Sequence, residues 1–351
     1  PFLDSSHWHP NTRLGPLVQS VGGGEAGTLD VPMEGFPDVA AGRYAQRFMR
    51  ERSDERPFTL FCALPGPHSP WMVPEEFGIR YDPRDIPDWP NRYDDFHGKP
   101  INQKKLRLME DGDEIARGSG LQDLLACAFS YLELVDTVVG EVVSTLRELG
   151  LYDDTAVFLT ADHGDMAGSH GFRSKGAYMY DEIYRIPMLF KPPGGSAVRR
   201  AGEPVNLMDA TATMVHIMAG EQVRDIGSGE LDGRSLLPLT AGAADWYKSV
   251  NYSEYHGDWY GHYSSRMVTD GRWKLVWNLS DLGELYDLGE DPHELKNLFY
   301  EPSARKVRDG YFEVLREEAR RFGDGQLDLL DPEDIEHRLG ENLSGPLPIS
   351  R

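Results

Sequence analysis

The distribution of apolar residues predicts alternating strands and helices over the larger part of the chain. Short runs rich in β-branched and aromatic residues at 58–64 and 155–161 are typical of buried strands. Between them, apolar residues recur at helical spacing from Leu121 to Leu149, and Gly150 provides a stop for this helix. A strand, a long helix and a second strand in this order predict an α/β fold with a largely parallel sheet flanked by helices.

The pattern changes toward the C-terminal end and predicts a second, smaller unit there. Asp270-Gly271 separates two β-rich runs and is a strong signal for a two-residue hairpin turn. We therefore expect an α/β domain over residues 1–245 and an α+β subdomain over residues 246–351, with a small antiparallel sheet, a helix and a tail. The segment 65–120 is rich in Pro, Asp and aromatic residues, and we expect it to cross over the site rather than to form core. Further helices are predicted at about 40–52, 207–218 and 303–322.

Composition and charge exclude several classes of partner. The formal net charge is −22, and a nucleic acid or an anionic membrane surface requires a basic binding face, so neither is expected as a partner. An anionic substrate would have to be captured by a local group of cations. No apolar run approaches the roughly 20 residues that cross a bilayer, so no membrane span is predicted. The two cysteines, Cys62 and Cys127, both lie in apolar runs and are expected to be buried thiols rather than a disulfide.

The end of the strand predicted at 155–161 carries the most informative chemistry. It is followed at once by Asp162 and His163, and ligands in open α/β sheets bind beyond the carboxyl ends of the strands. A carboxylate and a neutral imidazole are both competent ligands for a divalent cation, whereas the alternative interpretation is an ordinary turn. The next residues form one long glycine-rich loop that also carries His170 and Lys175. Such a loop is more often functional than structural, which favours a metal site.

Several short motifs occur in an order that is typical of one family. The first group is Asp162-His163-Gly164, Gly168-Ser169-His170-Gly171, Lys175-Gly176 and Arg185-Ile186-Pro187. The run at 58–64 leads into Pro67-His68-Ser69-Pro70, and Glu284-Leu285-Tyr286-Asp287-Leu288 lies near the end. In this order the motifs resemble the sulfatase family of the alkaline phosphatase superfamily. The resemblance implies an alkaline phosphatase-like fold and a metal-dependent, arylsulfatase-like hydrolase of sulfate esters, with a small-molecule or glycan ester as substrate.

The resemblance also implies a role for each candidate residue. Asp162 and His163 would be the metal ligands, Lys175 would hold a sulfate oxygen, and His68 would contact the sulfate or the oxygen of the leaving group. These roles suit the side chains, because a carboxylate binds a hard cation, an ammonium is a compact charge and an imidazole can act as a general acid. Calcium is the expected metal. Manganese is the second choice, because His163 replaces the Asn of many calcium-dependent members and is a softer donor.

Two further histidines are candidates for substrate binding. His7 lies in Ser6-His7-Trp8-His9, where the family often carries Lys-x-His, although Ser5 stands at the position expected for the lysine. His170 lies in the Gly-x-His-Gly motif. There it would bind substrate, orient the metal ligands through a hydrogen bond without touching the metal, or hold the loop in place. Asp165 is expected to stabilise the loop rather than to take part in catalysis.

Two elements of the family pattern are absent from these 351 residues. The family nucleophile is a formylglycine made from the first residue of Cys/Ser-x-Pro-Ser-Arg, and neither Cys62 nor Cys127 begins this motif. The paired N-terminal aspartates of the family's metal site are missing too, and the sequence begins at Pro1. We therefore expect the C-terminal majority of a sulfatase-like protein, with its nucleophile segment outside this chain, and no catalytic competence in this form.

Two other functions remain open from the sequence. Related phosphonate monoester and phosphodiester hydrolases share the Asp-His pairing, the fold and the metal, so the motifs do not separate them from sulfatases. A non-catalytic relative that binds anionic esters or glycans would explain the missing nucleophile, but it would have no physical need for Asp162, His163, His68 and Lys175 together. The sequence indicates neither the oligomeric state nor a cytoplasmic, periplasmic or secreted location.

Overall fold

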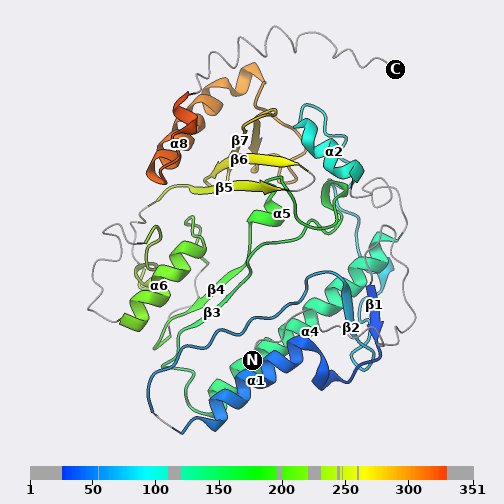
Figure 1. The fold of residues 1–351 in the computed structure, drawn as a ribbon, viewed down its shortest axis with the longest axis vertical. Helices are drawn as coiled ribbons and strands as arrows, with labels where there is room; N and C mark the ends of the chain where they lie inside the picture. Colours follow the sequence, from blue (N-terminus) through cyan, green and yellow to red (C-terminus); the bar gives the residue numbers. More distant parts are fainter. Residues whose placement is uncertain are drawn as a thin grey trace.

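The computed structural model describes residues 26–53, 55–109, 120–195, 200–219, 231–242, 246, 248–258 and 261–329. Two long helices lie side by side at one end of the molecule, a four-stranded sheet lies at the other end, and a pair of strands lies between them (Figure 1). The helices are α1, Pro37–Glu51, and α4, Leu121–Glu148. Within the described residues, no helix combines the length and the apolar composition needed to cross a membrane.

The two long helices build the first core. Pro37 occupies the first turn of α1, where its missing N–H costs nothing. The helices approach so closely that a Cβ at Gly42 would lie only 2.4 Å from Val138 Cγ1. A parallel pair of strands packs beside α4, β1 at Ala26–Leu29 and β2 at Trp71–Pro74. Side chains from all four elements form one buried apolar cluster, so this end of the molecule is well packed.

The central strands are β3, Val157–Thr160, and β4, Met188–Lys191, which pair antiparallel. Phe158 and Phe190 stack across the pair with ring centroids 4.2 Å apart. Neither strand contains a buried residue, and Leu189 is 61% exposed. These strands are apolar and yet open to solvent, which is unusual for a central pair in an α/β protein.

The four-stranded sheet is antiparallel throughout, in the order β5-β6-β7-β8. It is covered by α8 at Arg305–Arg321, which contacts β5, β6 and β7 and closes a second apolar core with them. The β6–β7 hairpin turns at Asp270-Gly271, where Gly271 has a φ of +89° and the Asp270 carboxylate accepts the N–H groups of two turn residues. The strands are Asn251–Asp258, His262–Thr269, Trp273–Asn278 and Glu284–Asp287.

The remaining elements are short. The helices α2, α5, α6 and α7 cover Ile101–Met109, Asp181–Tyr184, Leu207–Ala219 and Leu237–Thr240. Among the described residues, 3-10 helices cover Met33–Gly35, Pro83–Asp85, Ser169–Gly171, Pro302–Ala304 and Gln326–Leu329.

The predicted α/β class, the smaller antiparallel sheet and the four long helices are confirmed. The strand predicted at 58–64 is wrong, because this apolar run pairs with no strand among the described residues. In the part of the chain that the structure describes, parallel pairing is limited to β1 with β2. The prediction that segment 65–120 forms no core is wrong in part, since Trp71, Met72 and Val73 of β2 are buried core residues. The domain boundary between residues 245 and 246 stays a prediction.

Candidate functional site

The first two candidate residues are in direct contact. His68 lies in the loop Pro65–Pro70 before β2, and Lys175 lies in the glycine-rich loop after β3. The Nζ atom of Lys175 is 2.5 Å from Nε2 of His68, and Nδ1 of His68 is 2.6 Å from the carbonyl oxygen of Ser69. A carbonyl only accepts, so we assign the hydrogen to Nδ1. The lone pair of Nε2 then accepts from the Lys175 ammonium, and His68 is neutral in this arrangement.

The second pair follows β3 directly, as the sequence predicts. His163 donates its backbone N–H to Asp162 Oδ1 at 2.9 Å, and its Nδ1 lies 2.8 Å from the Gly164 carbonyl oxygen. The same reasoning places the hydrogen on Nδ1 and leaves the lone pair of Nε2 available to a metal. This Nε2 is 3.7 Å from Asp162 Oδ2, which is close enough for one cation to contact both atoms.

The donor types therefore fit a divalent cation, although a calcium ion takes six to eight oxygen ligands in typical sites. Asp162 and His163 can supply two ligand atoms, one carboxylate oxygen and one imidazole nitrogen. The Asp162 side chain is 86% exposed, so its carboxylate is open to an ion from solvent. A mixed set of this kind suits manganese as well as calcium.

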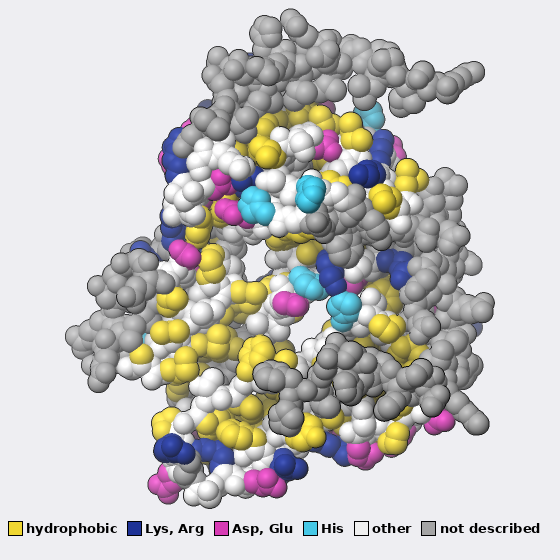
Figure 2. Space-filling view, in the orientation of Figure 1, with side chains coloured by type: hydrophobic (Ala, Val, Ile, Leu, Met, Phe, Trp, Pro, Cys, Tyr) yellow, Lys and Arg dark blue, Asp and Glu magenta, His cyan; other side chains and the backbone are white. Residues whose placement is uncertain are grey.

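The two pairs form one group. The rings of His68 and His163 are 6.5 Å apart between centroids and meet edge to face. In the space-filling view, histidine, Lys/Arg and Asp/Glu side chains gather beside a hollow in the middle of the face (Figure 2). The loop 65–70 and the end of β3 are far apart in the sequence, so the fold has brought the four predicted residues together. Their assigned roles stay predictions.

Asp165 is closer to this group than the sequence analysis expected. Its Oδ1 accepts the backbone N–H of Ala167 at 2.8 Å, which is the predicted loop-stabilising bond. Burial raises the pKa of Asp165, and the hydrogen bond from the Ala167 N–H and the nearby Lys175 ammonium oppose that rise. The carboxylate thus lies within electrostatic reach of the candidate residues. Its spacing three positions after Asp162 was the only hint in the sequence.

The turn after β3 is held in place by α5. Gly164 donates its N–H to the Ile183 carbonyl oxygen at 2.8 Å. A Cβ at position 164 would lie 1.9 Å from the Glu182 carbonyl oxygen, so only glycine permits this approach. The residue that follows the two predicted ligands therefore packs backbone against backbone on α5, which fixes where the ligands lie.

His170 corrects one prediction. It is fully buried, its Nδ1 lies 2.7 Å from Asp94 Oδ2, and its ring stacks on Tyr180 with centroids 3.8 Å apart. A substrate cannot reach a side chain enclosed in this way, so direct substrate binding by His170 is not supported. The geometry fits the alternative that His170 holds the loop. Burial lowers the pKa of His170, although the hydrogen bond with Asp94 opposes this shift.

The sequence did not predict that Asp94 and the C-terminal sheet hold the segments that carry the candidate residues. Asp94 also binds Lys99 at 2.5 Å. On the other side of the loop, buried Lys274 of β7 binds Asp181 Oδ1 at 2.5 Å and Glu294 Oε1 at 2.8 Å. Asp181 is the first residue of α5, so the sheet anchors the helix on which the Asp162-His163 turn rests. No sequence motif indicates these long-range ion pairs, because their partners come from separate segments.

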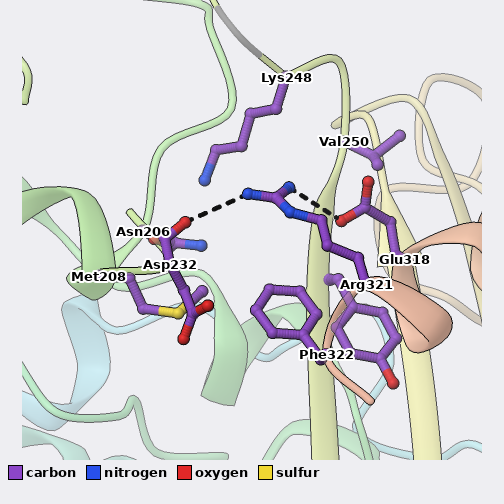
Figure 3. Close-up of a pocket in the computed structure, with 9 residues that line it drawn as sticks. Asn206, Met208, Asp232, Lys248, Val250, Glu318, Arg321 and Phe322 are labelled. Carbon is purple, nitrogen blue, oxygen red and sulfur yellow. Dashed lines mark hydrogen bonds and ion pairs between the residues drawn. The ribbon is translucent and has the colours of Figure 1, made fainter. Parts of the chain in front are cut away.

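Two other features lie outside this group. His7 is outside the described residues. A pocket between the start of α6 and α8 is bounded by Arg321, which donates to the Asp232 carbonyl oxygen at 3.3 Å and to Glu318 at 3.4 Å (Figure 3). None of the candidate residues lines it, so we place the chemistry at the open surface near His68 rather than in this pocket.

A group of metal-capable side chains also occurs on the C-terminal sheet. Glu254, His256 and Asp324 offer ligand atoms within 4.8 Å of one another. Asp324 is already bound by the Arg266 guanidinium at 2.6 Å, and Glu254 Oε2 lies 3.1 Å from His256 Nε2. The arginine neutralises part of the charge that a cation would need, so this group is a weaker metal site than its composition suggests.

Comparison with protein families gives two matches. The model described as Sulfatase matches residues 11–220, which is more than half of the chain. The model described as N-sulphoglucosamine sulphohydrolase, C-terminal, matches residues 168–321.

Curated relatives point the same way. The uncharacterized sulfatase YidJ of Escherichia coli K12 is 30% identical over 265 residues, which are 75% of this chain and 51% of the relative. An arylsulfatase of Clostridium perfringens is 27% identical over 296 residues, or 80% of this chain and 57% of the relative. The chain thus spans about half the length of these curated relatives.

Solved structures share the fold. A structure assigned as a sulfatase from Bacteroides thetaiotaomicron matches with a TM-score of 0.67 and 25% identity, over 86% of this chain and 68% of the other. A protein in complex with its substrate D-glucosamine-2-N,6-O-disulfate matches with a TM-score of 0.70 and 19% identity, over 85% and 72%. The phosphonate monoester hydrolase of Agrobacterium radiobacter matches with a TM-score of 0.68 and 21% identity, over 84% and 62%.

Proposed function

This chain belongs to the sulfatase family, and we propose that it forms the part of a sulfuric ester hydrolase that binds the metal and the sulfate group. The observation that carries the proposal is the contact between Lys175 and His68 beside the Asp162-His163 turn. It places a cation, an imidazole and a pair of metal-capable donors on one open surface. A sulfate monoester carries one negative charge and presents several oxygens, so it requires this combination of groups.

The residues of the chain have separate tasks in the reaction. The Lys175 ammonium donates hydrogen bonds to a sulfate oxygen and offsets its charge. When the ammonium turns toward the sulfate, the Nε2 of His68 becomes free and takes up a proton from solvent. His68 then donates this proton to the ester oxygen as the leaving group departs. Asp162 and His163 would hold the divalent cation, which supplies Lewis-acid stabilisation of charge on the transferring group when it is bound.

The nucleophile would come from outside these residues. The printed sequence contains no Cys/Ser-x-Pro-Ser-Arg motif from which a formylglycine is made. The open faces of β3 and β4 support this part of the proposal, because apolar strands such as these are normally covered in an α/β protein. We infer that further polypeptide covers the strands and supplies the nucleophile and the remaining metal ligands.

The relatives support a proposal for the substrate class. The match to a family described by N-sulphoglucosamine sulphohydrolase and the fold shared with a protein bound to a disulfated glucosamine support a sulfated sugar. The arylsulfatase relative supports an aryl sulfate. We therefore propose a small-molecule or glycan sulfate ester as substrate, with calcium as the first and manganese as the second candidate for the metal.

Titration calorimetry with sodium sulfate, in the presence of calcium or manganese, tests the proposal directly. We expect sulfate to bind only weakly, because part of the site lies outside this chain, and we expect the metal to increase the affinity. Absence of sulfate binding with either metal would contradict the proposal. We also expect no turnover of 4-nitrophenyl sulfate by the 351-residue chain alone. Turnover at the rate of an intact sulfatase would show that the nucleophile is misassigned.

A phosphonate monoester hydrolase is the second candidate. It is favoured by His163 at the second ligand position and by the fold shared with the Agrobacterium radiobacter enzyme. Competition between phenyl sulfate and phenyl phosphonate monoesters separates the two functions. Both esters carry one negative charge at neutral pH, and they differ in the central atom and in the carbon that replaces one oxygen on phosphorus. Tighter binding of the phosphonate ester would replace the sulfatase proposal. A non-catalytic binding protein is the third candidate and predicts sulfate binding without any dependence on metal.

A further inference from the structure

The carboxylate of Asp38 is fully buried near the start of α1, far from the candidate site in the sequence. Its Oδ1 accepts the backbone N–H of Gly66 at 2.8 Å, and its Oδ2 accepts the hydroxyl of Tyr131 at 2.8 Å. Burying a carboxylate is costly unless hydrogen bonds replace its hydration. The two donors therefore define both the orientation of Asp38 and the path of the backbone at Gly66.

Gly66 is also held from the opposite side by α4. A Cβ at this position would lie 2.4 Å from Tyr131 Cε2 and 2.8 Å from Val135 Cγ2. The backbone of Gly66 thus lies between the α4 side chains and the Asp38 carboxylate, and a larger residue would fit only if Tyr131 or Val135 moved. Trp71 fixes the next residue, because its Nε1 donates to the Pro67 carbonyl oxygen at 3.0 Å.

His68 follows these two anchored residues directly. Its backbone N–H donates to the Pro65 carbonyl oxygen at 3.1 Å, which closes the loop. The His68 ring is exposed and is not enclosed by packing. The ring is held by the Ser69 carbonyl oxygen of its own loop and meets Lys175 and His163 only at its open side, so its place beside them depends on where the backbone of the loop lies.

We propose that Asp38 is a positioning residue for His68, which acts through the Gly66 backbone with Tyr131 as its partner. Asp38 does not touch the substrate, and its carboxylate sets the distance between His68 and both Lys175 and His163. The functional meaning of this placement rests on the proposed sulfate site, whereas the placement itself can be measured without substrate.

The test compares Asp38→Leu, which keeps a similar volume but cannot accept a hydrogen bond, with Asp38→Asn, which keeps one acceptor for Gly66 N–H. The first measurement is the nuclear Overhauser effect between ring protons of His68 and His163. The sample is the 351-residue chain with labelled histidines, and the His68 signals are those that disappear in His68→Gln. We expect Asp38→Leu to lose this effect and Asp38→Asn to retain it. The second measurement is the dissociation constant for sodium sulfate. We expect it to rise about ten-fold in Asp38→Leu and less than about three-fold in Asp38→Asn.

Asp209→Leu is the matched control. Asp209 is another fully buried carboxylate, which accepts the backbone N–H of Arg234 at 2.9 Å and binds Lys248 at 2.7 Å. Its loss should lower the melting temperature and leave both the His68–His163 effect and the sulfate affinity unchanged. A purely structural role for Asp38 predicts the same outcome for Asp38→Leu. A folded Asp38→Leu variant with both measurements at wild-type values would therefore overturn the proposal.

Tyr131→Phe keeps the test decisive if Asp38→Leu does not fold. This change leaves the ring against Gly66 and removes one of the two donors to Asp38. We expect a weaker His68–His163 effect and a sulfate dissociation constant raised about three-fold. Unchanged values in Tyr131→Phe, or no effect between the two rings in the wild type, would overturn the proposal. If the wild type binds no sulfate, the proposed function fails, and the measurement between the rings still decides the role of Asp38.

Discussion

The ammonium of Lys175 lies 2.5 Å from the imidazole Nε2 of His68, although the two residues are 107 positions apart in the sequence. The contact joins the loop before β2 to the loop after β3. It also requires a neutral His68, since a protonated ring would repel the ammonium. The structure thus places a cation and a proton acceptor next to each other, and in the proposed function an incoming sulfate would draw the ammonium away from the imidazole.

Replacement of Lys175 with methionine should weaken sulfate binding. The substitution removes the charge and keeps most of the side-chain length, and a hydrogen bond to a charged group contributes about 1.5–3 kcal/mol. We therefore expect the dissociation constant for sodium sulfate to rise by roughly ten-fold or more. Lys104→Met removes an exposed lysine on α2 and is the control, with no expected change. Equal affinities in wild type and Lys175→Met would exclude Lys175 from the sulfate site.

Replacement of Asp162 with alanine should abolish most of the metal affinity. The side chain is largely exposed, so its loss should leave stability nearly unchanged, while the charge of the ligand set falls by one. We expect the dissociation constant for manganese, measured by calorimetry, to rise by at least about ten-fold. His256→Ala is the matched variant, because it removes the histidine of the other metal-capable group. If only His256→Ala loses metal, the ion binds on the C-terminal sheet and our assignment is wrong.

The buried Glu294 should make stability depend on pH. Burial raises the pKa of Glu294 from 4.5 to about 7, although Lys274 opposes the shift. Between these values the unfolded chain ionises while the folded chain stays protonated, so the contribution is full below about pH 4.5 and is lost as the pH rises to about 7. A difference of this size corresponds to on the order of 3 kcal/mol.

His170 has the opposite effect, because burial lowers its pKa and its contribution is lost as the pH falls below 6.5. The comparison of wild type with Glu294→Gln isolates the glutamate. The free energy of unfolding is measured in urea at about pH 5 and at about pH 7.5. We expect it to decrease over this interval in the wild type and to decrease by less in Glu294→Gln. The exposed Glu317→Gln should follow the wild type. Parallel curves for wild type and Glu294→Gln would show that Glu294 does not titrate in this range.

The sequence predicts correctly those helices and turns that are determined by residues close together in the chain. The helix at 121–148 follows from the spacing of its apolar residues, and the β6–β7 hairpin follows from Asp270-Gly271. The run at 58–64 has the same apolar character as β3, but a strand also needs a neighbour with which to pair. The described residues provide none for 58–64, so local propensity alone gave the wrong element there.

The candidate site shows the same division. Asp162, His163, Lys175 and His68 were identified from motifs, and the structure brings them together. The residues that hold these four in place were not identified from the sequence, because the partners of each contact come from distant segments. Asp38 reaches Gly66, Asp94 reaches His170, and Lys274 reaches Asp181. No periodicity or spacing in one sequence reports such contacts.

Gly164 provides the sharpest test of how the metal-capable turn is held. A Cβ at this position would lie 1.9 Å from the backbone oxygen of Glu182, and its next neighbours are also backbone atoms of α5, which cannot turn aside as a side chain can. Gly164→Ala should therefore push the turn away from α5, lower stability by about 1–3 kcal/mol and weaken manganese binding. Gly140→Ala is the control, because Gly140 is in α4 with open space around it. That change should raise stability by about 0.5–1 kcal/mol and leave metal binding unchanged. If Gly164→Ala binds manganese as the wild type does, the contact with α5 supports the fold alone and does not position Asp162 and His163.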